Sequence, residues 1–166
     1  MKKVTHLTLI FLMLIVLLIV IWRDVRVETV MNNIKYSVKD LEPTIFSTEQ
    51  LNNLPGVSIN YLHVNNSSNT IDYELINSTN DTLYYGDGVI LEKNIKEKWY
   101  KMPYSGDIGF VAILNYLSPF DTSEIRIPMG AWKTVTSGDY RIILEVSNEE
   151  DLNNLYPISA YFTIDK

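Results

Sequence analysis

The side chains best suited to acid–base or metal chemistry are scarce in this sequence. Its 166 residues contain two histidines, His6 and His63, and no cysteine. A zinc site needs three or four His, Cys or carboxylate ligands, so a single His63 beyond the apolar N-terminus is poor material for one. A Ser-His-Asp triad could use His63, but no Gly-x-Ser-x-Gly elbow supports it. We therefore expect no catalytic histidine, no metal and no cofactor.

Carboxylates are the remaining candidates, because two of them held about 5–9.5 Å apart in a cleft can hydrolyse glycosides. The acidic residues 149–151 lack the alternating ligand spacing of a dedicated calcium loop. Acidic side chains beside turns are far more often solvated than catalytic. The sequence therefore predicts that the protein is not an enzyme. A cell-envelope hydrolase is a minor alternative, which would use carboxylates near predicted turns: Asp107, Asp121, Glu124 and Asp139.

Aromatic side chains gather in two neighbouring segments and could bind a partner. Tyr84 and Tyr85 fall in one predicted strand, and Trp99 and Tyr100 fall in the next. Adjacent strand residues point to opposite faces, so one member of each pair should point away from the core. Exposed aromatic rings can anchor a protein partner or contact sugar rings. The alternative is that these four candidate binding aromatics only cover sheet edges.

The elements that would position these residues show a period of two from residue 57 onward. Apolar and polar residues alternate in short segments, and polar clusters such as NSTND at 77–81 separate them. Gly86 and Gly88 indicate a bend or bulge, and the Asn-x-Ser/Thr patterns are interpreted as turn chemistry. We expect an all-β antiparallel sandwich of about seven strands over residues 57–166. Its strands would come from segments 57–64, 71–76, 83–93, 96–102, 123–129, 139–146 and 157–165, and the apolar segment 110–117 could be a further strand or a loop-packing segment.

The stretch TSGDYRIILEV at 136–146 predicts a structural tyrosine. In Greek-key sandwiches, a tyrosine near the start of one strand hydrogen-bonds back to the chain a few residues upstream, which forms a tyrosine corner. Tyr140 fits because Gly138 permits a tight turn and the inward alternation starts at Tyr140. Ile142 then occupies the place of the cysteine of antibody-type domains, so aliphatic burial replaces a disulfide. The alternative is an ordinary strand tyrosine after a hairpin turn.

Four segments between residues 71 and 146 carry a family resemblance: NSTND, LYYGDGVILEKNIKEKWYKMP, SPFDTSEIRIPM and SGDYRIILEV. Together they resemble the bacterial immunoglobulin-like domains of membrane-anchored or lipoprotein-type proteins in Gram-positive bacteria. The resemblance covers about half of the chain and implies an immunoglobulin-like sandwich in an extracytoplasmic setting. It implies no catalytic residues. The chain departs from the pattern because it has no cysteine for lipid attachment.

A long apolar segment precedes the predicted sandwich. Residues 4–22 are almost all apolar, and at about 1.5 Å per helical residue they nearly cross a hydrocarbon core of roughly 30 Å. Charged Arg23, rather than small residues, follows the run. We expect residues 1–23 to be an uncleaved signal anchor, and the protein to be secreted if they are cleaved. Lys2 and Lys3 favour a cytoplasmic N-terminus, with a single pass through a bacterial membrane.

Residues 24–56 are predicted to be a juxtamembrane stalk or a linker between the anchor and the sandwich. Apolar residues recur there at three- and four-residue steps, which allows a short helix ending before Pro43 or a dimerising seam. Of the chain's 14 basic and 20 acidic residues, three basic ones precede residue 24, so the rest carries a formal charge of −9. Such a surface repels phosphates, and nucleic-acid binding is not expected.

The sequence predicts a non-enzymatic, membrane-anchored, extracytoplasmic binding or structural module. It would present sheet or loop surface on a rigid scaffold to an unknown protein or cell-wall partner. The alternative is an accessory ectodomain that acts on a partner membrane protein through its transmembrane helix.

Overall fold

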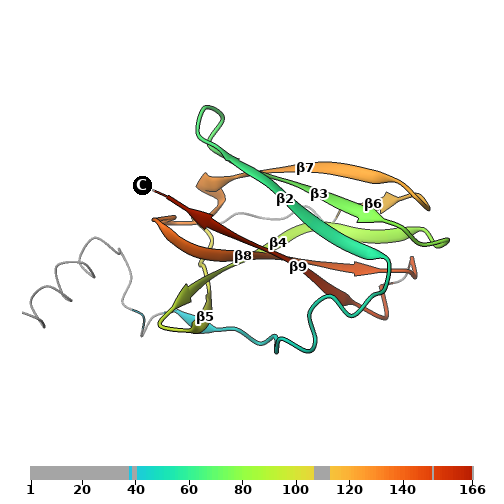
Figure 1. The fold of residues 1–166 in the computed structure, drawn as a ribbon, viewed down its shortest axis with the longest axis horizontal. Coiled ribbons are helices and arrows are strands. Elements are labelled where there is room, and N and C mark those ends of the chain that lie inside the picture. Colours follow the sequence, from blue (N-terminus) through green and yellow to red (C-terminus); the bar gives the residue numbers. More distant parts are fainter. Residues whose placement is uncertain (1–37, 39–40, 107–112, 151, 166) are drawn as a thin grey trace, which may run out of the picture. The chain divides into compact units, whose positions relative to one another are not determined.

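Two antiparallel sheets face each other across one core in the described part of the chain (Figure 1). The computed structural model describes residue 38 and residues 41–106, 113–150 and 152–165, apart from the side chain of Leu62. Contacts divide the chain at Asp40, and Leu41–Lys166 forms one compact unit. The prediction of an all-β fold is therefore confirmed.

The predicted signal anchor, residues 1–23, lies outside the described residues. Within the ranges that the structure describes, no helix has the length and hydropathy needed to cross a bilayer. A short 3-10 helix, Met129–Ala131, follows the seventh strand. The strands therefore carry the described architecture.

The larger sheet has six strands in the order β1-β5-β4-β8-β9, and β6 pairs with β4 beside them. Its centre is the pairing of β4 with β8, where the register shifts between Tyr85 and Val89. This shift is the bulge that Gly86 and Gly88 predicted. The strands are β1 (Glu42–Pro43), β4 (Leu83–Ile95), β5 (Lys98–Lys101), β6 (Leu114–Leu117), β8 (Gly138–Ser147) and β9 (Tyr156–Ile164).

The smaller sheet has three strands in the order β2-β3-β7. They are β2 (Val57–Asn65), β3 (Thr70–Asn77) and β7 (Thr122–Pro128). The central strand β3 pairs with β2 on one side and with β7 on the other. In the described residues, β7 therefore has one paired edge and one edge without a strand.

The predicted strand at 96–102 begins two residues later than expected. Lys96 and Glu97 have φ of 53° and 65° and form the turn between β4 and β5. The Asn94 side chain accepts a hydrogen bond from the Glu97 amide at 3.0 Å, which stabilises this turn. Pattern reading missed the turn because neither residue is a usual left-handed turn residue.

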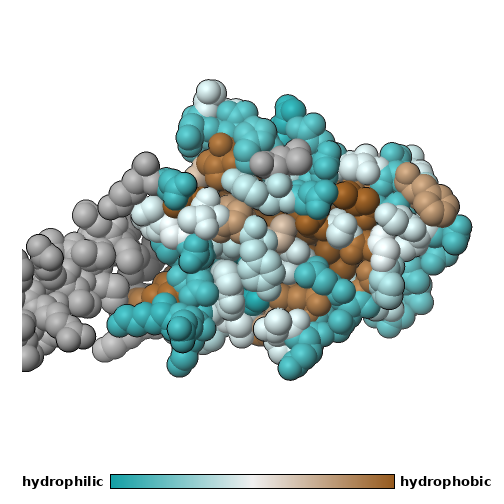
Figure 2. Space-filling model, in the orientation of Figure 1, coloured by the Kyte–Doolittle hydropathy of each residue, from teal (hydrophilic) through white to brown (hydrophobic). Residues whose placement is uncertain are grey.

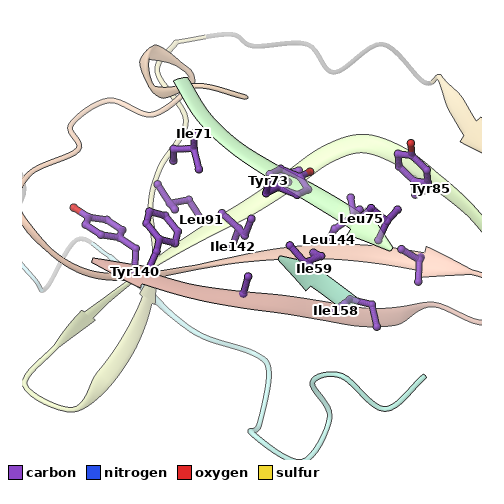
Figure 3. Close-up of a cluster of buried hydrophobic side chains, with 14 of the residues drawn as sticks. Ile59, Ile71, Tyr73, Leu75, Tyr85, Leu91, Tyr140, Ile142, Leu144 and Ile158 are labelled. Carbon is purple, nitrogen blue, oxygen red and sulfur yellow. The ribbon is translucent and has the colours of Figure 1, made fainter. Parts of the chain in front are cut away.

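The core fills the space between the sheets with alternate side chains of each strand (Figure 3). Tyr140, Ile142 and Leu144 of β8 face Ile71 and other residues of β3 there, and each is almost fully buried. Period-two patterning in β3, β8 and β9 therefore sends apolar side chains inward as predicted. In Figure 2, apolar side chains show through an otherwise hydrophilic surface between the two sheets.

Asn77 organises the turn between β3 and β4. Its side-chain nitrogen, Nδ2, donates hydrogen bonds to the carbonyl oxygens of Asp81, Leu117 and Ser118. Its side-chain oxygen accepts from the amide and hydroxyl of Thr79. The side chain is buried, and all of its hydrogen-bonding groups are used. The turn interpretation of this Asn-x-Thr pattern is thus confirmed at Asn77.

Residues 41–56, which were predicted to belong to a stalk, pack against the sandwich as a strap. Figure 1 shows this strap running from beside β5 to the start of β2 along the outer side of the larger sheet. Leu41 and Leu51 are buried, and so is Ile143, which points to the outer face of β8. The boundary predicted at residue 57 is therefore too late. Because β8 carries apolar residues on both of its faces, its outer face needs a second covering layer, and the strap provides it.

The strap is fastened at both of its ends. Near its start, β1 pairs with β5, and the Thr44 amide donates to the Trp99 carbonyl oxygen at 3.0 Å. Near its end, the Asn52 amide donates to the Pro157 carbonyl oxygen at 2.9 Å. The Asn52 side chain also exchanges two hydrogen bonds with Ser159 of β9. These contacts hold the strap across the outer face of the sheet.

A buried ion pair lies on this outer face. The Arg141 guanidinium donates to one carboxylate oxygen of Glu92 through Nε at 2.7 Å and through Nη2 at 2.6 Å. Both side chains are only 1% exposed. Arg141 also donates to the Thr44 hydroxyl of the strap at 3.0 Å, and its guanidinium carbon lies 4.6 Å from the centre of the Trp99 ring. The strap thus completes the environment of a charge pair that links β4 to β8.

Candidate functional site

Tyr140 hydrogen-bonds back to the chain four residues upstream. Its hydroxyl donates to the Thr136 carbonyl oxygen at 2.6 Å and accepts from the Thr136 amide at 3.1 Å. Gly138 has a φ of 141°, and a Cβ there would lie 3.0 Å from the Lys93 side chain. Lys93 in turn donates to the Thr136 hydroxyl and to the Ser137 carbonyl oxygen. This arrangement has the geometry of a tyrosine corner.

Tyr140→Phe should lower the free energy of unfolding by about 0.5–1.5 kcal/mol, because it removes the hydrogen bonds that the half-buried carbonyl and amide of Thr136 form with the Tyr140 hydroxyl. Equilibrium urea denaturation measures the change. Tyr116→Phe is the matched control, since Tyr116 is 70% exposed. Equal stability of the Tyr140→Phe and Tyr116→Phe proteins would contradict a stabilising corner.

The four candidate binding aromatics offer little free surface. Tyr85 belongs to the core between the sheets, and Tyr84 is half-buried on the other face of β4. Trp99 and Tyr100 are both half-buried on β5. The Trp99 ring is covered in part by the guanidinium of Arg141. None of these four rings is fully exposed.

Four of the seven large apolar side chains that are exposed in the described residues lie on and around β6. We call this group the β6 patch: Ile113, Leu114, Tyr116 and Phe120. Tyr116 and Phe120 are each 70% exposed. Sequence reasoning missed the patch because the apolar segment 110–117 was expected to be a strand or a loop-packing segment, and neither expectation indicates an exposed surface. Among the described strands, β6 pairs with β4 alone, at the first residues of β4, and the alternation along its four residues turns Leu114 and Tyr116 outward.

A cleft of about 630 Å³ lies beside β7, and we call it the β7 cleft. Residues 124–128 of β7 form one wall. The bulged part of β4, including Tyr85, Gly86 and Asp87, forms the other wall, and Asn115 of β6 contributes to it. Tyr73 of β3 also lines the cleft. The volume falls within the range typical of ligand pockets, about 300–1,000 Å³.

The Tyr73 hydroxyl is buried and has no hydrogen-bond partner among the described residues. Figure 3 shows Tyr73 with its hydroxyl directed toward the side of the core where Tyr85 lies. Burial, together with Tyr85 and the negative charge of Asp87, raises the pKa of Tyr73 well above its usual value. The group is therefore a neutral hydroxyl that can donate and accept one hydrogen bond each. Sequence patterning placed Tyr73 on the core face but carried no sign of this unpaired hydroxyl.

The candidate acids and His63 take part in local contacts. Asp121 accepts a hydrogen bond from the next amide, that of Thr122, and Asp139 accepts one from a hydroxyl of β9. Glu124 pairs with Arg126 at 2.6 Å. His63 lies 3.5 Å from Asp72. In the described ranges, no three His, Cys, Asp or Glu side chains are grouped as metal ligands. Asp107 and Asp151 lie outside those ranges.

Comparison with known proteins gives a family match over the sandwich. The sequence model of a family described as a bacterial Ig-like domain matches residues 53–163, which is most of the described sandwich. No curated protein matches the sequence. The family match covers more than half of the chain and includes the paired strands β2 to β9. The chain therefore belongs to the bacterial immunoglobulin-like domain family.

Proposed function

We propose that this protein is a non-enzymatic module anchored in a bacterial membrane by residues 1–23, with its immunoglobulin-like domain outside the cytoplasm. The domain would bind a protein or cell-wall partner through a preformed surface on a rigid sandwich. Family membership supports a binding or structural role. The apolar run at residues 4–22 supports the anchor.

The observation that carries this proposal is the β6 patch. Large apolar side chains grouped on one edge of a domain are typical of interaction surfaces, and aromatic residues contribute strongly to binding energy. Tyr116 and Phe120 present most of their surface to solvent. They replace Tyr84, Tyr85, Trp99 and Tyr100 as the aromatic contacts that we propose for a partner.

Photo-crosslinking in living bacteria tests the patch. A photoreactive phenylalanine analogue at Tyr116 or Phe120 of the full chain should give a discrete crosslinked product after irradiation. The same analogue at Tyr161, which is 50% exposed on β9, is the control. Products of equal intensity at Tyr116 and Tyr161, or none at Tyr116 and Phe120, would exclude the patch as the partner surface. The anchor is tested in the same cells: a mature N-terminus beyond residue 23 in the culture medium would show a secreted protein instead.

A further inference from the structure

We propose that the β7 cleft binds an extended peptide with a basic side chain, and that this peptide adds as a strand to the edge of β7 that no described strand pairs with. The site differs from the β6 patch and has a different ligand chemistry, so the inference goes beyond the proposed function. Either surface can fail its test without affecting the other.

The wall formed by β7 is a strand edge. Five consecutive residues, 124–128, line the cleft. Side chains of a strand point alternately to opposite faces, so a cleft over one face of β7 would be lined by every second residue. Five consecutive lining residues indicate that the cleft runs along the edge of the strand. The other side of β7 pairs with β3 from Thr122 to Pro128. Alternate residues of β7 therefore direct their N–H and C=O groups toward the cleft, and no described strand pairs with them. An extended peptide is the ligand that can pair with these backbone N–H and C=O groups, as a neighbouring strand would.

Tyr73, which lines the cleft, has an unused hydrogen-bonding group. The Tyr73 hydroxyl is buried, neutral and without a partner among the described residues. Buried polar groups are rarely left unpaired. A polar group that loses its hydrogen bonds to water on burial, and forms none within the protein, destabilises the folded state. A peptide carbonyl or amide that reaches Tyr73 would provide the missing partner.

The same surroundings disfavour a sugar as the ligand. Carbohydrate recognition commonly uses the exposed face of an aromatic ring. The aromatic residues that line this cleft are Tyr73 and Tyr85, and both are buried in the core. A ligand in the cleft can therefore gain more from hydrogen bonds to the backbone of β7 than from stacking on an aromatic ring.

The charge at the cleft favours a basic side chain. Asp87 accepts a hydrogen bond from the neutral amide of Asn115 at 2.6 Å. The cation that lines the cleft, Arg126, is already 2.6 Å from Glu124. Among the described residues no cation forms an ion pair with the Asp87 carboxylate, which lies at the exposed bulge of β4, where a lysine or arginine of the peptide could reach it.

Selection from a phage-displayed library of random linear peptides, against the full chain in detergent, tests the proposal. Synthetic versions of the selected peptides are then titrated by calorimetry. Gly130→Trp should abolish binding, because Gly130 lines the cleft and an added Cβ there meets no atom within 4 Å. Gly88→Trp is the matched control: Gly88 is exposed in the same bulge, has equally open space, and does not line the cleft.

Two smaller substitutions test the chemistry within the cleft. Tyr73→Phe should weaken peptide binding about fivefold to tenfold through one lost hydrogen bond, while its melting temperature stays at or above that of the unmodified protein. Asp87→Asn should weaken binding by a similar factor and reduce its dependence on salt. Bound peptide should also slow hydrogen exchange at alternate amides of β7.

Several results would overturn the proposal: recovery of no peptide, peptides without lysine or arginine, or equal binding by the Gly130→Trp and Gly88→Trp proteins. An oligosaccharide that binds the unmodified protein and is blocked by Gly130→Trp would assign the cleft to a glycan instead. Circular dichroism checks that each variant is folded. If Gly130→Trp does not fold, Tyr73→Phe decides, and unchanged peptide affinity in that variant rejects the site.

Discussion

Glu92→Ala should lower the free energy of unfolding by about 3–5 kcal/mol, because it leaves the Arg141 guanidinium buried without its counter-charge. Arg141 is 1% exposed, so water cannot replace the lost carboxylate. Urea denaturation followed by tryptophan fluorescence measures the change, and Trp99 reports it locally because its ring contacts Arg141. With a slope of about 1–3 kcal/mol per molar urea, the midpoint should fall by at least about 1 M.

The exposed pair of Glu124 and Arg126 is the matched control for this experiment. It has the same 2.6 Å separation, but its side chains are 47% and 65% exposed. Glu124→Ala should therefore cost only about 0–1 kcal/mol. Replacing both Glu92 and Arg141 by leucine and methionine should cost much less than Glu92→Ala alone, since no unpaired charge remains. A Glu92→Ala protein as stable as the Glu124→Ala protein would contradict the buried pair.

Removal of the strap should have the largest effect. A protein of residues 57–166 lacks the buried Leu41 and Leu51, whose burial contributes about 1.5–3 kcal/mol each. It also loses the hydrogen bonds of Thr44 and Asn52 and opens Ile143 and the ion pair to water. These losses are comparable with the whole stability of a domain, about 5–15 kcal/mol. We expect residues 57–166 to be largely unfolded at 37 °C.

The protein of residues 41–166 provides the comparison, because it keeps the entire strap. We expect it to give a cooperative thermal transition by circular dichroism and dispersed amide signals by NMR. Ile45→Ala in the protein of residues 41–166 tests whether any substitution in the strap lowers the melting temperature. It should have little effect, since Ile45 is 83% exposed. Equal melting temperatures for residues 41–166 and 57–166 would show that the strap contributes nothing to stability.

Much of the sandwich follows from local patterning. The alternation in segments 71–76, 139–146 and 157–165 corresponds to β3, β8 and β9, because one face of each strand packs into the core. Two glycines in segment 83–93 mark the bulge of β4. These features are predictable because they depend on residues that are neighbours in the chain.

The strap was not predictable in the same way. Its sequence has few apolar residues, and the three-residue steps before Pro43 suggest a helix rather than a cover for a sheet. A signal existed in β8, where Ile142 and Ile143 are adjacent and both are fully buried. Adjacent apolar residues in a strand indicate that both faces are covered. The pattern does not say which segment supplies the second cover.

The β7 cleft depends on relations that alternation does not encode. Alternation assigns residues to a face, but the cleft is formed by an edge of one sheet opposite a bulge in the other. Its walls come from residues near 86 and near 126. The exposure of Tyr116 and the partial cover of Trp99 also depend on which strands happen to be neighbours.

The bonds between Asn52 and Ser159 join residues 107 positions apart in the chain. The ribosome makes Asn52 before Ser159, so this end of the strap has no docking partner on β9 until that strand has emerged. Contacts this distant also carry a large loop-closure entropy, which slows their formation. Until β9 is in place, the Asn52 end of the strap cannot dock, and the covering of the outer face is completed only after that strand pairs with β8.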